Sequence, residues 1–252
     1  MALIEEFKTQ GDFLFKNRGH LPLIIVAIGM AVFVYEVYNG NSVSNSDNPI
    51  VKYYYEICFL VGILGLAIRC HVVGHAPDRT SGRNIENQVA DVVNTKGMYS
   101  VLRHPLYLGN FFMWLAVALL TMNLWFIIAF VLFYIVYYER IMYSEEAFLR
   151  NKFGEGYLNW ADKTPAFIPA LSQYQAVEAS FNFKKILKKE KNGILALLSL
   201  FWFFNLIEYS IINYQAGLEF KFELNYWFYA SLAIAVYYVV LKVIKISKKK
   251  SK

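Results

Sequence analysis

Charged residues, histidine and cysteine are all scarce in this chain of 252 residues. Asp, Glu, Lys and Arg together make up 17% of it, and there are 4 histidines and 2 cysteines. Cys58 and Cys70 form neither a CxxC pair nor a Cys/His zinc pattern, so we interpret both as packing residues. His71 and His75 have HxxxH spacing but lack the glutamate of HExxH, and we expect Gly74 and Pro77 to break the helix there. We therefore expect no metal site.

The features of a signal peptide are missing from the first 20 residues. The stretch MALIEEFKTQGDFLFKNRGH carries acidic residues and lacks both a continuous apolar core and a small-residue cleavage site. We therefore expect the first hydrophobic segment to remain in the protein as an anchor.

Apolar and aromatic residues are abundant instead, at 57% and 18% of the chain. A soluble domain is roughly 45–50% apolar, so this composition predicts an all-α, polytopic helical membrane protein. The net charge of +6 is modest, and basic cytoplasmic loops explain it without nucleic acid as a partner. A span needs roughly 20 apolar residues. Six stretches are long enough, or nearly so: Leu21–Tyr38, Ile50–Ile68, Leu106–Met122, Leu124–Met142, Ile194–Ile212 and Tyr226–Ile246.

Lysine and arginine set the predicted orientation of these six or so transmembrane helices. With both termini in the cytoplasm, the opposite side holds only Lys52 and Lys221. The other 23 of the 25 basic residues fall on the cytoplasmic side, which follows the positive-inside rule. They lie in residues 1–20, 69–105, 139–193 and 242–252.

A tight hairpin is predicted between the third and fourth spans. Pro105 suits the first turn of a helix, and the chain turns near Asn123. Two antiparallel helices of similar length bring the residues before Pro105 to the depth at which the fourth span ends. The hairpin therefore gathers an imidazole, two arginines and a carboxylate pair at the cytoplasmic boundary: Arg103, His104, Arg140, Glu145 and Glu146.

Such a cluster suits a polar cofactor that meets a lipid-embedded substrate. Carboxylates accept hydrogen bonds from ribose hydroxyls and favour a nearby positive charge, and Tyr99 and Tyr107 can cover a purine or a cation. Arginine can hold a carboxylate or phosphate in a two-pronged contact. The alternative is a set of interfacial residues whose long side chains snorkel to water.

Other polar residues of the apolar regions favour structural roles. Glu36, Glu56 and Glu208 fall towards the external ends of their spans, where we expect interfacial or structural functions. The segment FNFKKILKKEKNG, residues 181–193, fits either a surface helix on anionic lipid or a solvated basic linker.

Two stretches, GMYSVLRHPLYLGN and EEAFLRNKFGEGYLNWADKTPAFIP, resemble the conserved half of the isoprenylcysteine carboxyl methyltransferase and phospholipid methyltransferase superfamily. The pattern is G-x-Y-x-x-x-R-H-P-x-Y-x-G, a helical hairpin and E-E-x-x-L-x-x-x-F-G-x-x-Y, and it covers about residues 94–169. The resemblance implies an integral membrane enzyme that uses S-adenosyl-L-methionine. Carried over by position, the cofactor-binding residues are Tyr99, His104, Pro105, Leu106, Tyr107 and Glu145.

The resemblance also implies catalytic roles for Arg103, His104, Arg140 and Glu146. Either arginine would clamp a phosphate or carboxylate, and His104 or a carboxylate would help an amine acceptor to lose its proton. The substrate-binding arginine of the eukaryotic branch aligns with Ile141, one residue after Arg140, so an isoprenylcysteine substrate does not simply carry over. Asn84 aligns weakly with a cofactor-contacting amide of that branch.

These observations predict a methyltransferase that acts on a lipid or lipidated acceptor: a phospholipid amine, a lipid phosphate or a prenylcysteine-like carboxylate. The partners expected are this substrate and the bilayer, without nucleic acid or metal. We expect a multi-pass protein of a bacterial inner membrane with its active site facing the cytoplasm, the endoplasmic reticulum membrane being the alternative. The expected regions are 1–93 with two spans, 94–170 with the methyltransferase-like hairpin, 171–192 as a basic juxtamembrane linker and 193–252 with two spans.

Two other functions fit parts of the pattern. Membrane reductases of the sterol-reductase type use NADPH and carry a similar R-H-P-x-Y stretch, but they usually lack E-E-x-x-L, which is intact here from Glu145 to Leu149. A non-enzymatic membrane scaffold would need no clustered polar site. The methyltransferase is therefore the favoured prediction.

Overall fold

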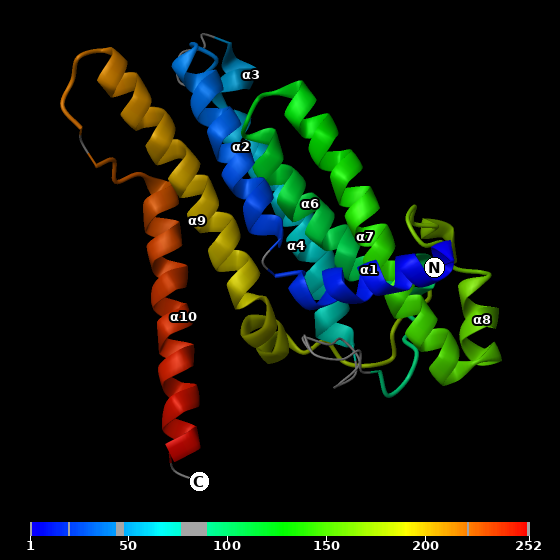
Figure 1. Ribbon diagram of the computed structural model, residues 1–252. Helices are drawn as coiled ribbons and strands as arrows, with labels where there is room; N and C mark the ends of the chain where they lie inside the picture. Colours follow the sequence, from blue (N-terminus) through cyan, green and yellow to red (C-terminus); the bar gives the residue numbers. More distant parts are fainter. Residues whose placement is uncertain (1, 20, 44–47, 77–89, 221, 251–252) are drawn as a thin grey trace.

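The computed structural model describes residues 2–19, 21–43, 48–76, 90–220 and 222–250, and these are helices joined by loops (Figure 1). Within these ranges there is no strand beyond an isolated bridge between Gly97 and Gln175. The predicted all-α class is confirmed. The helices are α1 Leu3–Asn17, α2 Leu21–Tyr38, α3 Pro49–Lys52, α4 Tyr54–His75, α5 Met98–Val101, α6 Pro105–Leu119, α7 Leu124–Phe153, α8 Glu155–Ala161, α9 Phe183–Gln215 and α10 Tyr226–Lys250, with a 3₁₀ turn at Leu171–Gln173.

Several of these helices are long and apolar enough to cross a membrane. Four of the described helices, α4, α7, α9 and α10, meet that criterion, and α1 with α2 would be a fifth span bent by 73°. Helix α6 is apolar but shorter, with 15 residues. These helices indicate an integral membrane protein. The count of six spans and the cytoplasmic termini stay predictions.

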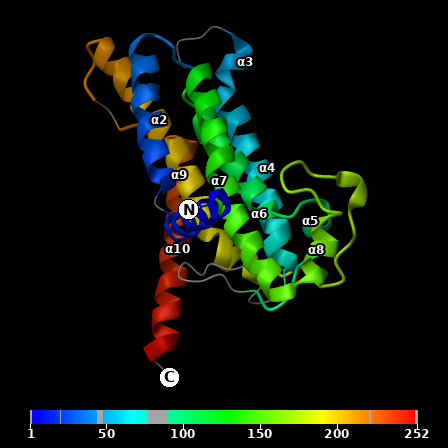
Figure 2. The same cartoon turned by 45° about the vertical axis from the view of Figure 1, so that its right-hand side comes forward.

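Helices α2, α4, α6, α7 and α9 form a bundle, with α10 along the outer side of α9 and α1 lying across the bundle (Figures 1 and 2). Helices α4 and α6 approach most closely at Gly65 and Gly109. A Cβ atom at Gly65 would lie 2.4 Å from the carbonyl oxygen of Gly109 and 2.8 Å from the amide nitrogen of Met113. Glycine is therefore required here for the two backbones to touch.

The hairpin of α6 and α7 forms as the sequence predicts. Pro105 occupies the first turn of α6, and Asn123 caps α7 by accepting a hydrogen bond from the amide of Phe126 at 2.8 Å. The side-chain amide of Asn123 also donates to Glu36 at 2.6 Å. Glu36 thus fastens α2 to the hairpin turn, which is a structural role.

Aromatic side chains fill the core between α2, α4, α6 and α9. Phe201 and Phe204 of α9 are fully buried, and Phe204 meets Phe33 of α2 at a ring distance of 4.8 Å. Glu208 of the same helix is only 1% exposed, and the carboxylate of Glu56 accepts a hydrogen bond from Tyr226. Close van der Waals packing of this kind, together with interhelical hydrogen bonds, stabilises a bundle whose outer surface faces lipid.

The basic segment 181–193 largely belongs to a helix. Helix α9 begins at Phe183, where Asn182 caps it by accepting from the amide of Lys185, and continues without a break to Gln215. The lysines therefore occupy the first turns of a long helix that continues into the apolar bundle.

The close approach of α4 and α6 generates a prediction for stability. Gly65→Ala places a methyl group against backbone atoms that cannot rotate away, so we expect a loss of about 1–3 kcal/mol. Gly156→Ala is the matched control, because nothing lies within 4 Å of a Cβ there and alanine favours a helix. Thermal unfolding in detergent measures both variants. An unchanged melting temperature for Gly65→Ala would contradict the proposed packing.

Candidate active site

The end of the hairpin opposite Asn123 carries a compact polar cluster. Glu146 of α7 receives a hydrogen bond from Nη1 of Arg103 at 2.7 Å, and its other oxygen lies 2.8 Å from Nε2 of His104. The second imidazole nitrogen, Nδ1, is 3.6 Å from Glu145. The short α5 helix and the non-helical His104 before Pro105 direct both basic side chains at the end of α7.

Tyr107 connects the second carboxylate to the same cluster. Its hydroxyl donates to Glu145 at 2.7 Å, and its ring stacks on that of His104, with 5.7 Å between centroids and 16° between planes. The backbone carbonyl of Tyr107 accepts from the hydroxyl of Tyr134 at 2.8 Å. Glu145 is thus held by a side chain that is itself fixed from two directions.

Burial and neighbouring charges shift the pKa of the His104 imidazole in opposite directions. His104 is 8% exposed, and burial alone would lower its pKa, but hydrogen bonds to Glu145 and Glu146 and their negative charges outweigh this and raise the pKa above 6.5. Tyr157 of α8 lies beside the cluster, where burial first and then the charge of Glu146 raise its pKa. Within the described part of the chain, Nε of Arg103 is buried and has no hydrogen-bond partner.

Arg140 lies away from this cluster and contacts α1. Its guanidinium carbon is 3.4 Å from the centroid of the Phe7 ring, and its Nε donates to Gln10 at 3.3 Å. Ile141, the residue in the aligned position, is fully buried. The structure therefore brings together Arg103, His104, Tyr107, Glu145 and Glu146 and places Arg140 elsewhere.

A pocket of about 270 Å³ lies near the cluster, and the five clustered side chains do not line it. It lies between the end of α4, residues 92–99 and residues 177–179, and Tyr99 is part of its wall. Burial and then the charge of Glu145 raise the pKa of Tyr99, so this tyrosine is close to both the pocket and the cluster. Polar side chains that the sequence did not nominate also line it: His71, His75 and Asn94.

The sequence offered little signal for these additional lining residues. The HxxxH pair was visible, but its place beside the pocket depends on how α4 packs against residues 92–99. Pro105 and Leu106 occupy the first turn of α6 and directly follow His104 in the sequence. Asn84 lies outside the described residues.

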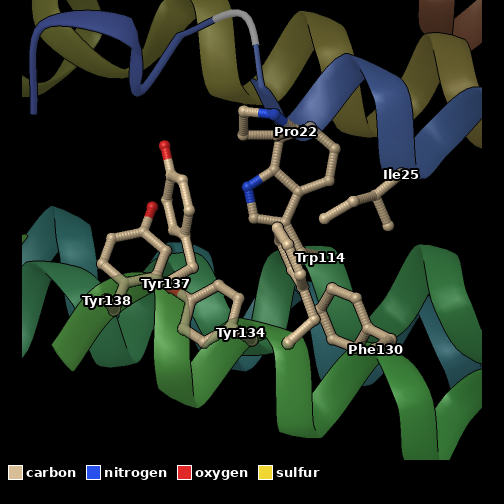
Figure 3. A pocket seen from close by; sticks show the side chains of 8 residues that line it. Pro22, Ile25, Trp114, Phe130, Tyr134, Tyr137 and Tyr138 are labelled. Carbon is tan, nitrogen blue, oxygen red and sulfur yellow. The ribbon is translucent and has the colours of Figure 1, made fainter. Parts of the chain in front are cut away.

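An aromatic crevice lies on the bundle side of the cluster, between the start of α2 and the hairpin (Figure 3). Figure 3 shows the indole of Trp114 reaching towards Pro22 at the start of α2, with the tyrosines of α7 beside it. The ring of Tyr138 is 4.6 Å from that of Tyr107, which joins this wall to the polar cluster. The crevice is lined by Pro22, Ile25, Trp114, Phe130, Phe133, Tyr134, Tyr137 and Tyr138.

The arrangement can bring a polar ligand and an apolar ligand together. The clustered carboxylates and the nearby pocket beside Tyr99 can meet a polar ligand, and the aromatic side chains within the bundle can meet an apolar one. Among the residues that the structure describes, no three His, Cys, Asp or Glu side chains form a group that could hold a metal ion.

Comparison with known proteins supports the same segment. Residues 84–156 match the family model described as phospholipid methyltransferase. The chain is 36% identical over 81 residues to the cobalt-zinc-cadmium resistance protein CzcN of Cupriavidus metallidurans, which is 32% of this chain and 37% of that protein. It is 33% identical over 82 residues to the nickel-cobalt-cadmium resistance protein NccN of Alcaligenes xylosoxydans xylosoxydans, at 32% and 38%. No solved structure matches.

The fold and this match define a class: a helical membrane protein with a segment that is similar to phospholipid methyltransferases. The match confirms the resemblance to the phospholipid methyltransferase family over the segment that contains the cluster. The chain spans less than two fifths of the length of the curated relatives it matches.

The raised pKa of His104 gives a pH-dependent prediction. A histidine whose folded-state pKa lies above 6.5 adds stability that is complete below that pH and is lost as the pH rises through the folded-state pKa. We expect His104→Gln to lower the melting temperature most near about pH 6 and progressively less towards about pH 9. His75→Gln is the control, since His75 bonds a backbone carbonyl and not the carboxylate pair. A deficit in His104→Gln that stays constant with pH would contradict the ion pairing.

Proposed function

We propose that this protein is an S-adenosyl-L-methionine-dependent methyltransferase that acts on a membrane-embedded or lipid acceptor. The observation that carries the proposal is the contact of Tyr107 and His104 with Glu145 and Glu146 inside the segment that matches phospholipid methyltransferases. Two carboxylates, an aromatic wall and a nearby pocket suit a cationic, ribose-containing cofactor. The lipid-facing helices around the cluster suit a substrate that arrives from the bilayer.

The residues present fit this cofactor in their chemistry. Glu145 can accept hydrogen bonds from ribose or amino groups and favours a sulfonium charge nearby, while Tyr99 and Tyr107 offer aromatic faces to a purine or a cation. When bound, S-adenosyl-L-methionine supplies an electrophilic methyl group. The chain's own task is to hold that group in line with the acceptor at about 3–3.5 Å and to exclude water.

The charge of the cluster favours an amine acceptor over an anionic one. Arg103 and the imidazole of His104 both pair with the carboxylates, while Arg140 packs on α1. Both basic groups are thus already engaged, whereas an acceptor carboxylate or phosphate would need one of them as its partner. An ammonium headgroup would be attracted to the carboxylates, and His104 or a carboxylate can accept the proton that an amine loses before it attacks.

A phospholipid amine would also bring a headgroup phosphate. The guanidinium of Arg103 is a donor group suited to that phosphate, and it lies beside the carboxylates that favour the amine. We propose that the reaction takes place at the cytoplasmic face, because the predicted topology puts 23 of the 25 lysines and arginines on the side of the cluster. The R-I-M-x-x-E-E spacing favours a bacterial inner membrane.

The NADPH-dependent reductase is the weaker alternative. NADPH brings several phosphate charges, whereas Arg103 and His104 are already engaged by Glu145 and Glu146. Phosphate groups next to these carboxylates would meet like charge, which disfavours such a ligand.

Methyl transfer from a labelled donor tests the proposal. Membranes that contain the protein should transfer label from S-adenosyl-L-methionine into the lipid fraction, and Glu145→Ala should reduce this at least about tenfold because the cofactor loses its carboxylate contact. Glu155→Ala is the matched control, because Glu155 is an exposed carboxylate at the start of α8.

The stability of the label identifies the acceptor class. Label that survives alkali indicates an N-methyl group, as we expect, whereas label released as methanol indicates a methyl ester. Absence of lipid label above that of membranes without the protein would contradict the proposed activity.

A further inference from the structure

Arg69 of α4 makes a buried, two-pronged ion pair outside the segment that matches the family. Its Nε lies 2.8 Å from Oε2 of Glu190, and its Nη2 lies 2.9 Å from Oε1. The remaining terminal nitrogen, Nη1, donates to the side-chain oxygen of Asn110 at 2.5 Å. Glu190 belongs to α9 and is 1% exposed. One guanidinium therefore joins α4, α6 and α9.

The glycine contact between α4 and α6 allows Arg69 to reach this position. A Cβ atom at Gly109 would lie 2.5 Å from Cγ of Arg69, so the arginine stem crosses α6 in the space that glycine leaves. The guanidinium then meets Asn110, the next residue of α6. A charge placed this deeply needs an opposite partner, and Glu190 provides it in the fork geometry that arginine favours.

Hydrogen bonds and ring contacts continue from Asn110 to the carboxylate cluster. The amide of Asn110 donates to the hydroxyl of Tyr138 at 3.2 Å, and the ring of Tyr138 stacks on that of Tyr134 at 4.3 Å. Tyr134 donates to the carbonyl of Tyr107 at 2.8 Å, and Tyr107 donates to Glu145 at 2.7 Å. The ion pair is thus connected to Glu145 through packed, hydrogen-bonded side chains.

We propose that Arg69, fixed by Glu190, is a positioning residue that holds the Asn110–Tyr138–Tyr107 wall so that Tyr107 orients Glu145 towards the cofactor. This role rests on the proposed methyl transfer. It makes α9 a functional part of the site, although α9 lies outside the matched residues 84–156. Because Glu190 neutralises Arg69, the arginine does not serve as an anion clamp.

Binding of S-adenosyl-L-methionine to the purified full chain in detergent tests the role of Arg69. We expect Arg69→Met to weaken binding about tenfold in the wild-type background and to have little further effect in the Glu145→Ala background, because its influence passes through Glu145. Arg69→Lys keeps the positive charge but loses the two-pronged guanidinium contact. Its affinity for S-adenosyl-L-methionine should therefore lie between those of the wild type and Arg69→Met. Arg150→Met is the control, since Arg150 is an exposed cation of α7.

A second variant distinguishes loss of positioning from loss of folding. Arg69→Met alone leaves a buried carboxylate without its partner, whereas Arg69→Met with Glu190→Met removes both charges and should restore the melting temperature. We expect this double variant to stay folded and still bind the cofactor weakly. Normal affinity in the folded double variant, or equal losses from Arg69→Met with and without Glu145, would overturn the positioning role. Failure of the wild-type chain to bind the cofactor would instead contradict the proposed function.

Discussion

The rest of the site depends on one constraint. Two adjacent carboxylates of α7 pair with side chains that flank the start of α6. Glu145 and Glu146 project from the end of a long apolar helix, where unpaired charges would be costly. Arg103, His104 and Tyr107 meet them there, at 2.7–2.8 Å for the closest contacts. The register of the hairpin is therefore fixed at both ends, by Asn123 at the turn and by this cluster at the other end.

The surrounding helices hold that register in distinct ways. Gly65 and Gly109 let α4 press against α6, and Arg69 uses the space to join both helices to α9. Helix α1 lies across the other side of α7, where Gly11 fits against the backbone of Arg140. Arg140 packs on α1, so Arg103 and His104 are the basic side chains that pair with Glu145 and Glu146. The same packing that stabilises the hairpin thus determines which basic side chains reach the carboxylates.

Much of this arrangement could be predicted from local sequence, and the remainder could not. Pro105, Asn123 and the apolar lengths between them determine a helical hairpin, so the meeting of His104 with Glu146 followed from counting residues. The direction in which the side chain of Arg140 points depends on α1, and the hairpin does not determine where α1 lies. The pairing of Arg69 with Glu190 spans 121 positions and requires the packing of α4 against α9. No spacing rule predicts such a contact.

The central claim is that the two ends of the hairpin form one cofactor-binding wall. Equilibrium titration with S-adenosyl-L-methionine tests it most directly, on the purified wild type, Tyr107→Phe, Glu145→Ala and the double variant. We expect each single change to weaken binding, and the double variant to bind no more weakly than the worse single variant, because both changes break one contact. Unchanged affinity in both single variants, or tight binding of NADPH instead, would contradict the account.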